Sequence, residues 1–233
     1  MKKIKLSFLA LFAATFAFVA CKEETTVTPD KSNVLVVHAS PNAPGVDLLV
    51  DNVKVNSAAL AFPDNTGYLS VNSGARNIKV NVSGSATTVI DATPTLTKDV
   101  NYSVFAIDSV SKISPLVTVD DLTAPASGKA HIRFIHLSPN APAVDVSVAG
   151  QAAGVGVFTN RTFNKTITAA QYAFTPVDAG NYHLEVRVAG TTTVALDLPS
   201  VTFTAGKIYT IFAKGFLGGT GAQALGAGVI VNK

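Results

Sequence analysis

The sequence has few of the residues that build disulfide networks or aromatic binding platforms. Its 233 residues include one cysteine, no tryptophan and only 14% charged residues. A single thiol cannot form a disulfide within the chain, so stability must come from a hydrophobic core. The lack of tryptophan weakens an assignment to the sugar-binding lectins, whose sites use aromatic rings.

The first 20 residues have the pattern of a bacterial export signal. Three lysines, Lys2, Lys3 and Lys5, precede an apolar run from Leu6 to Ala20. As a helix this run would be about 22 Å long, shorter than the roughly 30 Å hydrocarbon core of a bilayer. The pattern therefore predicts a cleaved signal peptide, residues 1–20, and not a membrane span.

The only cysteine, Cys21, follows this run directly, and "FVAC" resembles the lipobox of bacterial lipoproteins. In a lipobox, the cysteine after a small residue is lipidated and becomes the first residue of the mature protein. We expect several acyl chains to anchor the protein stably through Cys21, because one chain binds membranes only marginally. Residues 21–33 then form a polar, flexible tether.

The charged residues Lys22, Glu23 and Glu24 resemble a signal that sends lipoproteins to the outer face of the outer membrane. The sequence thus predicts a lipid-anchored protein of the bacterial outer membrane, exposed on the cell surface. The periplasmic face is the alternative. The predicted partners are the membrane, through the lipid anchor, and a glycan or protein partner.

The mature chain lacks the charge needed to attract nucleic acid. Removal of the three N-terminal lysines leaves 15 basic and 15 acidic residues. Without a basic stripe, the phosphate contacts that dominate nucleic-acid affinity are not available. We therefore predict no nucleic-acid partner.

One stretch of the sequence occurs twice. "HASPNAPGVDLLV" begins at His38, and "HLSPNAPAVDVSV" begins at His136. Similarity continues further on, where "SGARNIKVNVSG" resembles "DAGNYHLEVRVAG" and "NYSVFAI" resembles "IYTIFAK". This pattern predicts a tandem duplication, with domains at 34–122 and 130–233 joined by a linker at 123–129.

Within each half the apolar residues alternate with polar ones, as in half-buried strands. Ile78, Val80 and Val82 share one face, while Lys79 and Asn81 point the other way. Glycine, asparagine and proline interrupt these segments at short intervals, and no long helical periodicity follows the signal. We expect an all-β fold of two tandem immunoglobulin-like antiparallel β-sandwich domains. The strands expected in the first half are 34–39, 46–50, 53–56, 68–71, 76–82, 86–91, 101–107 and 113–119.

The repeated motif contains two prolines three residues apart, which a regular strand does not tolerate. It predicts a rigid turn from a strand ending near His38 to one starting near Val46. Asp47 and Asp145 should accept hydrogen bonds from the backbone amides of this bend. The predicted structural motif comprises His38, Ser40, Pro41, Pro44 and Asp47, and equivalently His136, Ser138, Pro139, Pro142 and Asp145.

A catalytic interpretation would join His38, Ser40 and Asp47 into a base, nucleophile and orienting acid. Proline holds Ser40 on a stiff segment two residues from His38, and no nucleophile elbow is recognisable. The same trio occurs in both halves, which is unusual for a catalytic site. We therefore predict that the protein is not an enzyme, and keep a hydrolase as the least favoured alternative.

The sequence predicts no metal site and no cofactor, with a surface calcium ion, which a sequence does not reveal, as the alternative. No histidine or cysteine pair has zinc spacing, and no twelve-residue calcium loop is present. "GFLGGTGAQALGAG", from Gly215 to Gly228, is rich in glycine but lacks the Gly-Lys-Ser/Thr signature of a phosphate-binding loop. We expect it to be a mobile hairpin loop between the last two strands.

Taken together, the motifs identify a family. A strand ending in His-x-Ser-Pro-Asn-Ala-Pro-x-Val-Asp, a glycine-led strand such as "GNYHLEV" and a segment such as "YTIFA" resemble domain of unknown function 4397. The resemblance covers nearly all of 34–122 and 130–233. It implies β-sandwich modules on exported bacterial proteins, and the family offers no established activity or catalytic residues.

The second half departs from this pattern by a segment about eight residues longer, between the motif and Gly180. It contains Phe158, Arg161 and Phe163, and aromatic rings beside polar groups can form a recognition surface. For Phe158 and Phe163 we expect a place in the core or at a domain interface, and contact of Phe158, Arg161 and Phe163 with a ligand is the alternative.

These observations favour a non-enzymatic, lipid-anchored cell-envelope protein whose two β-sandwich modules bind a glycan, a peptide or a protein. The alternative is a purely structural spacer or assembly subunit of an envelope complex.

Overall fold

The computed structural model describes residues 28–163 and 165–233. The predicted signal peptide, Cys21 and Lys22 to Glu24 lie outside the described residues. In the described part, no helix has the length and apolar character needed to cross a bilayer.

The predicted all-β sandwich fold is confirmed. The first half contains ten strands and one short 3₁₀ helix. They are β1 (Lys31–His38), β2 (Val46–Val50), β3 (Val53–Lys54), β4 (Asn65–Asn72), β5 (Gly74–Ala75), β6 (Ile78–Val82), β7 (Thr88–Ala92), β8 (Thr95–Leu96), β9 (Asn101–Ile107), η1 (Val110–Lys112) and β10 (Ser114–Asp120).

The second half contains eight strands, a single helical turn and another 3₁₀ helix among the described residues. They are β11 (Lys129–His136), β12 (Val144–Val148), β13 (Phe158–Arg161), α1 (Ala169–Tyr172), β14 (Thr175–Asp178), β15 (Gly180–Val188), β16 (Val194–Phe203), β17 (Ile208–Lys214), η2 (Gly221–Gln223) and β18 (Gly226–Val231).

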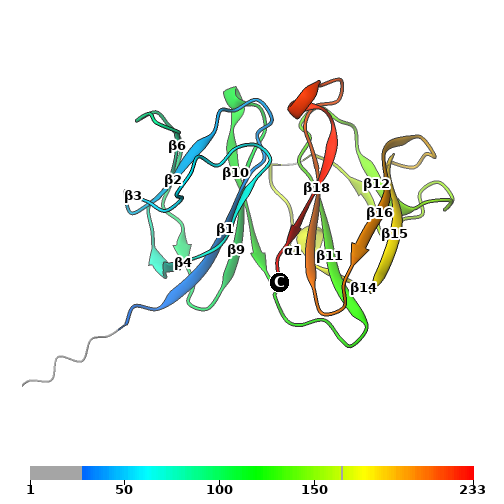
Figure 1. The fold of residues 1–233 in the computed structure, drawn as a ribbon, viewed down its shortest axis with the longest axis horizontal. Coiled ribbons are helices and arrows are strands. Elements are labelled where there is room, and N and C mark those ends of the chain that lie inside the picture. Colours follow the sequence, from blue (N-terminus) through cyan, green and yellow to red (C-terminus); the bar gives the residue numbers. More distant parts are fainter. Residues whose placement is uncertain (1–27, 164) are drawn as a thin grey trace, which may run out of the picture.

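The strands form two four-stranded sheets in each half, and the halves have the same strand order. The sheets of the first half run β10-β9-β1-β4 and β3-β2-β6-β7, and those of the second run β18-β17-β11-β14 and β13-β12-β15-β16. Strands β5 and β8 add a two-stranded sheet to the first half. The two halves lie side by side, with the C-terminus between them (Figure 1).

Two strand pairs differ from the expected antiparallel pattern. Strand β1 pairs with β9 in parallel, and β11 pairs with β17 in parallel. In each half, the first strand pairs with a strand that follows the strands of the other sheet in the sequence. The chain therefore crosses between the sheets before it returns beside its first strand, and it returns in the same direction. The remaining ladders are antiparallel, as predicted.

Each half has a hydrophobic core between its two sheets. In the first half, β1 supplies Val34 and Val36, which pack against residues of β2 and β6. In the second half, Ile132 and Phe134 of β11 pack in the same way against β12 and β15. Alternation along each strand therefore directs one set of apolar side chains into its own sandwich.

A third core joins the two halves. It is formed by the opposite face of β1, β9, β11 and β17, together with residues of β10 and β18. Its buried members are Leu35, Val37, Ala39, Phe105, Ile107, Leu116, Ile135, Leu137, Phe212 and Ile230. We call this contact the junction. It makes the molecule a stack of four sheets, with the β1-β9 and β11-β17 sheets in the middle.

Candidate functional site

The repeated motif forms the predicted turn. Residues 39–45 connect β1 to β2, and the amide of Ala43 donates to the carbonyl of Ser40 over 3.3 Å. His38 is 1% exposed, and its Nε2 lies 2.9 Å from the carbonyl oxygen of Pro44. Because a carbonyl can only accept, the ring donates through Nε2–H and the imidazole pins the two ends of the turn together.

The second copy repeats this arrangement. His136 is 3% exposed, and its Nε2 lies 3.0 Å from the carbonyl oxygen of Pro142. The motif asparagines also have matching roles. Asn42 accepts a hydrogen bond from Val110 at the start of η1, and Asn140 both accepts from and donates to the backbone of Leu217.

The glycine-rich loop lies between the last two strands, β17 and β18, as expected, and an asparagine of the motif contacts it. The loop is closed by the amide of Phe216, which donates to the carbonyl of Gln223 over 2.8 Å, and it contains the short helix η2. Asn140 ties Leu217 of this loop to the motif turn with bonds of 2.8 and 3.0 Å. The glycine-rich loop is therefore hydrogen-bonded to the motif turn of the second half.

The motif aspartates accept amide hydrogen bonds, as predicted, but from other turns. Asp47 accepts from the amide of Gly84 and Asp145 from that of Gly190, over 3.3 and 2.8 Å. Both glycines have positive φ angles, 70° and 72°, in the turns after β6 and β15. The prediction that the aspartates bind the bend of their own motif was wrong, because alternation along β2 and β12 turns these side chains toward the neighbouring hairpin.

Charge and further bonds hold the two carboxylates in place. Lys54 forms an ion pair of 2.8 Å with Asp47 and, with the amide of Gly84, holds the pKa of this carboxyl below its usual value. Asp145 is 2% exposed and also accepts from the amide of Asn160 over 2.7 Å. Each aspartate therefore clamps a turn to the start of a strand.

The structure does not assemble the catalytic trio. Ser40 is fully buried, and among the described residues neither its Oγ nor Nδ1 of His38 has a hydrogen-bond partner. Asp47 is bonded to Lys54 and the β6–β7 turn instead. A nucleophile needs a base within hydrogen-bond reach, and Ser138 and His136 lack one in the same way.

The buried motif histidines predict a pH-dependent stability. Burial lowers the pKa of His38 and His136 more than their bonds to the proline carbonyls raise it. Below a pH of about 6.5 the unfolded chain therefore binds protons that the folded chain does not. We expect the free energy of unfolding to fall as pH drops from 7 toward 5, by at most about 1.4 kcal/mol per pH unit for each histidine.

Urea denaturation at a series of pH values measures this slope. The double variant His38→Gln/His136→Gln retains two amide donors without a group that titrates in this range, so its slope should be flatter than that of the wild type. An unchanged slope in the double variant would assign the effect to other groups.

The enlarged segment of the second half places its two phenylalanines in the interior, as expected, and not on a recognition surface. Phe158 is 3% exposed and lies in the core of the second half, with the guanidinium of Arg161 5.4 Å from the centre of its ring. Phe163 packs against the junction core. The expected placement, in the core or at a domain interface, describes both phenylalanines.

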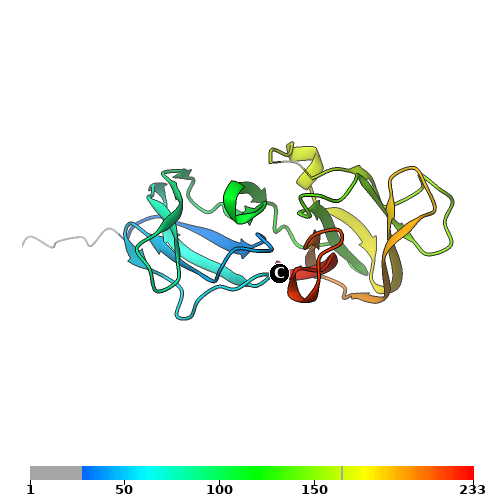
Figure 2. The same cartoon turned by 90° about the horizontal axis from the view of Figure 1, so that it is seen from above.

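The same segment fastens one half to the other. Lys165 forms an ion pair of 2.9 Å with Asp108 and donates to the carbonyl of Lys112, both in the first half. Ile167 packs beside Phe163 against the junction core. Figure 2 shows η1 and α1 on the same side of the junction. The additional residues of the second half therefore cover one side of the contact between the halves.

A buried ion pair lies within the junction. Arg133 of β11 donates to Asp120 of β10 over 2.7 Å, and both side chains are fully buried. The guanidinium also donates to the hydroxyls of Ser103, Thr118 and Thr210 over 2.7 to 3.2 Å. Four of its donors thus have acceptors, which a buried cation requires.

The acceptors of this network are satisfied in turn. Tyr68 and Ser103 donate to Oδ2 of Asp120, and Thr118 donates to Oδ1. Asn232, near the C-terminus, accepts from Thr210 over 2.7 Å and donates to Tyr68 over 3.1 Å. Burial, together with the charge of Asp120, raises the pKa of Tyr68 well above its usual value. Residues of both halves therefore share one closed set of hydrogen bonds.

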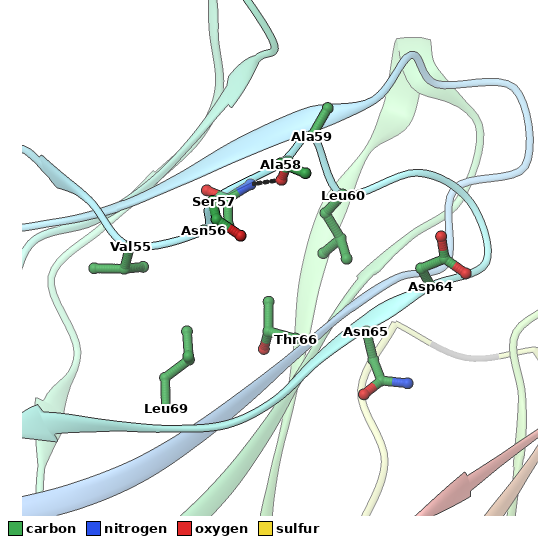
Figure 3. Close-up of a pocket in the computed structure, with 10 residues that line it drawn as sticks. All are labelled: Val55, Asn56, Ser57, Ala58, Ala59, Leu60, Asp64, Asn65, Thr66 and Leu69. Atoms are coloured by element: carbon green, nitrogen blue, oxygen red, sulfur yellow. Dashed lines mark hydrogen bonds between the residues drawn. The ribbon is translucent and has the colours of Figure 1, made fainter.

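The surface of the first half carries a polar hollow of about 470 Å³. It lies between residues 55–60 and β4, and its lining includes Asn56, Asp64 and Thr66 (Figure 3). Asn56 is already occupied, because its side chain donates to Val46 and Ala58 and accepts from Leu48. In the second half the corresponding connection is the enlarged segment, and a cavity of about 10 Å³ lies beside Arg161 and Ile167.

Two apolar clefts occupy similar positions in the two halves. The first has a volume of about 310 Å³ and opens between the edge strands β7 and β10, with Ile90 and Val117 in its lining. The second has a volume of about 340 Å³ and lies beside β16 and the glycine-rich loop, with Val194 and Leu217 in its lining. Val117 and Val194 are 50% and 44% exposed. Each sandwich thus leaves part of its apolar interior open at one side.

Three side chains that can ligate a metal meet on the outer sheet of the second half. Ligand atoms of His183, Glu185 and Asp197 all lie within 4.8 Å of one another. The sequence prediction of no metal site relied on spacing along the chain and missed this group. Its members come from β15 and β16, so that only the register of this hairpin brings them together.

Comparison with known protein families finds one match, which covers part of the chain. The model of a family described as a domain of unknown function (DUF4397) matches residues 32–147. The matched stretch runs from β1 to β12 and contains both copies of the repeated motif. No curated protein matches the chain.

Proposed function

We propose that this chain is a non-enzymatic, lipid-anchored protein of the bacterial cell envelope that binds a partner protein through its two apolar clefts. The observation that carries the proposal is the presence of an apolar cleft of similar size in each half. Concave apolar clefts are the usual sites of small-molecule binding, and exposed apolar surface is typical of sites where proteins interact. Their linings favour apolar side chains of a protein or peptide over a glycan.

The two halves are proposed to be tandem immunoglobulin-like sandwich domains that arose by duplication. Their sheets have matching strand orders, and each includes a parallel pair, β1 with β9 and β11 with β17. The motif residues also make matching bonds, from histidine to proline carbonyl and from aspartate to a glycine amide. The motif thus fixes the same corner twice, which favours architecture over chemistry.

If the partner binds through the clefts, a charge placed at their openings should weaken its binding. Val117→Asp together with Val194→Asp places a carboxylate at each opening, so that apolar side chains of a partner would have to desolvate it. We expect the amount of partner recovered by crosslinking on intact cells to fall at least about tenfold, corresponding to about 1.4 kcal/mol.

The matched control is the variant Val53→Asp/Val155→Asp, because both valines are exposed and neither lines a cleft. It should retain partner binding. Equal recovery from the cleft variant and the control would contradict the proposal.

Anchoring depends on Cys21, which lies outside the described residues. Replacing it in the variant Cys21→Ser should abolish labelling of the protein by a fatty-acid analogue and shift it from the membrane fraction to the soluble fraction. Loss of the acyl chains removes about 0.8 kcal/mol per CH₂ group that they bury. A Cys21→Ser protein that remains in the membrane fraction would contradict the lipid anchor.

A structural spacer or assembly subunit is the second candidate. It is favoured by the junction, because a core and a hydrogen-bond network shared by both halves suit a stiff element of fixed length. This candidate predicts that detergent extracts the protein within a defined complex. Extraction as a lone monomer would argue against it.

A further inference from the structure

We propose that His183, Glu185 and Asp197 form a binding site for a zinc ion on the outer sheet of the second half. This site goes beyond the proposed function and does not depend on the clefts. The three side chains supply one imidazole nitrogen and two carboxylate oxygens, a ligand set that zinc accepts.

The β15–β16 hairpin explains how the ligands meet. His183 and Glu185 are two residues apart on β15, so they point to the same face of the sheet. Glu185 is directly opposite Asp197 on β16. Nε2 of His183 already lies 2.5 Å from Oδ1 of Asp197, and side chains across a ladder hold such positions without any loop having to move.

The side chain of Arg187 holds Glu185 in place. Nε of Arg187 donates to its Oε2 over 2.7 Å, and NH1 of Arg187 donates to the carbonyl of Gln151 over 2.7 Å. Arg187 is 4% exposed, so this support is rigid. Both contacts of the guanidinium with Glu185 use Oε2, which leaves Oε1 for an ion. Outer groups that orient a metal ligand are a common feature of such sites.

The chemistry of the ligands selects the kind of ion. The imidazole nitrogen favours zinc and related transition metals over Ca²⁺ and Mg²⁺, which prefer oxygen ligands. Three protein ligands leave a fourth tetrahedral position for water or for a group from a partner. His183 and Asp197 are about half exposed, so this open position faces solvent.

The first half provides an internal control. In the repeat, Asn77, Lys79 and Asp91 occupy the positions of His183, Glu185 and Asp197. Asn77 donates to Asp91 over 2.7 Å, and the ammonium of Lys79 lies 3.9 Å from the same carboxylate. A lysine in place of the glutamate repels a cation, so the corresponding surface of the first half should not bind zinc.

Zinc titration of the full chain in competition with a chromogenic chelator tests the site. All proteins carry Cys21→Ser, so that the single thiol cannot contribute. We expect one zinc ion per chain, with affinity at least about tenfold lower in each of the variants His183→Ala and Asp197→Asn. Asp91→Asn, the matched change in the first half, should leave affinity unchanged, and excess Ca²⁺ or Mg²⁺ should not displace the zinc.

Two results would overturn the proposal. One is the absence of zinc binding by a chain whose circular dichroism spectrum shows that it is folded. The other is equal affinity for zinc in the wild type, His183→Ala and Asp197→Asn, which would place the ion elsewhere. Because both side chains are exposed, these variants should keep the unfolding midpoint of the parent protein.

Discussion

The variant Asp120→Ala should lose about 3–5 kcal/mol of the free energy of unfolding, because it leaves the buried guanidinium of Arg133 without its counter-charge. Both side chains of this pair are fully buried. The substitution also removes the acceptor of Tyr68 and Ser103, whose hydroxyls lie in the same closed network. Urea denaturation followed by circular dichroism measures the loss.

A double variant separates the contribution of the buried charge to stability from that of the lost packing. The double variant Asp120→Ala/Arg133→Met removes both charges, so it should be more stable than Asp120→Ala alone by at least about 1 kcal/mol. The control is Lys129→Ala, which breaks an exposed ion pair with Asp178 and should cost no more than about 1 kcal/mol. An Asp120→Ala variant as stable as this control would contradict the role assigned to the network.

The variant Phe105→Ala should destabilise the second half as well as the first. Phe105 belongs to β9 and is fully buried in the junction core, next to residues of β11 and β17. Truncation of a buried phenylalanine to alanine costs about 3–5 kcal/mol. If the halves unfold together, this loss lowers the protection of slow-exchanging amides in every central strand.

Hydrogen exchange read by mass spectrometry distinguishes a shared core from two separate ones. We expect protection to fall in β17 by about the same free energy as in β9. The control Val53→Ala changes an exposed side chain and should leave both strands unchanged. Loss of protection in β9 with wild-type protection in β17 would show that the halves unfold independently.

Much of the fold could be predicted because single strands follow local rules. The expected strands at 46–50 and 101–107 coincide with β2 and β9, and the two prolines of the motif place the turn between β1 and β2. Alternation identifies the face of a strand that enters its own sandwich, as in β6. These features depend on residues that are close in the sequence, where periodicity and turn chemistry act.

The strands that form the junction were not predicted, because alternation does not tell what covers the second face of a strand. The signal was present in the central strands, since "VLVVHA" and "FIHL" are almost continuously apolar, as in strands that are buried on both faces. Arg133 interrupts such a run, and its partner Asp120 is on the other side of the linker. Nothing in their spacing reveals that these charges meet.

The candidate sites show the same limit. The sequence favoured an interior place for Phe158 and Phe163 but could not say which contact they form, and their segment closes the second half and its junction with the first. His183 and Asp197 were missed because a hairpin register, and not a sequence motif, brings them together. Local patterns therefore predict the strands of this protein better than they predict its surfaces.

The central claim is that the junction makes the two halves one cooperative unit, and differential scanning calorimetry of the full chain tests it most directly. The shared core and the buried Arg133 network predict one unfolding transition, with a calorimetric enthalpy equal to the van't Hoff enthalpy. Two transitions, or a calorimetric enthalpy about twice the van't Hoff value, would show two independent domains joined by a linker and would contradict the account.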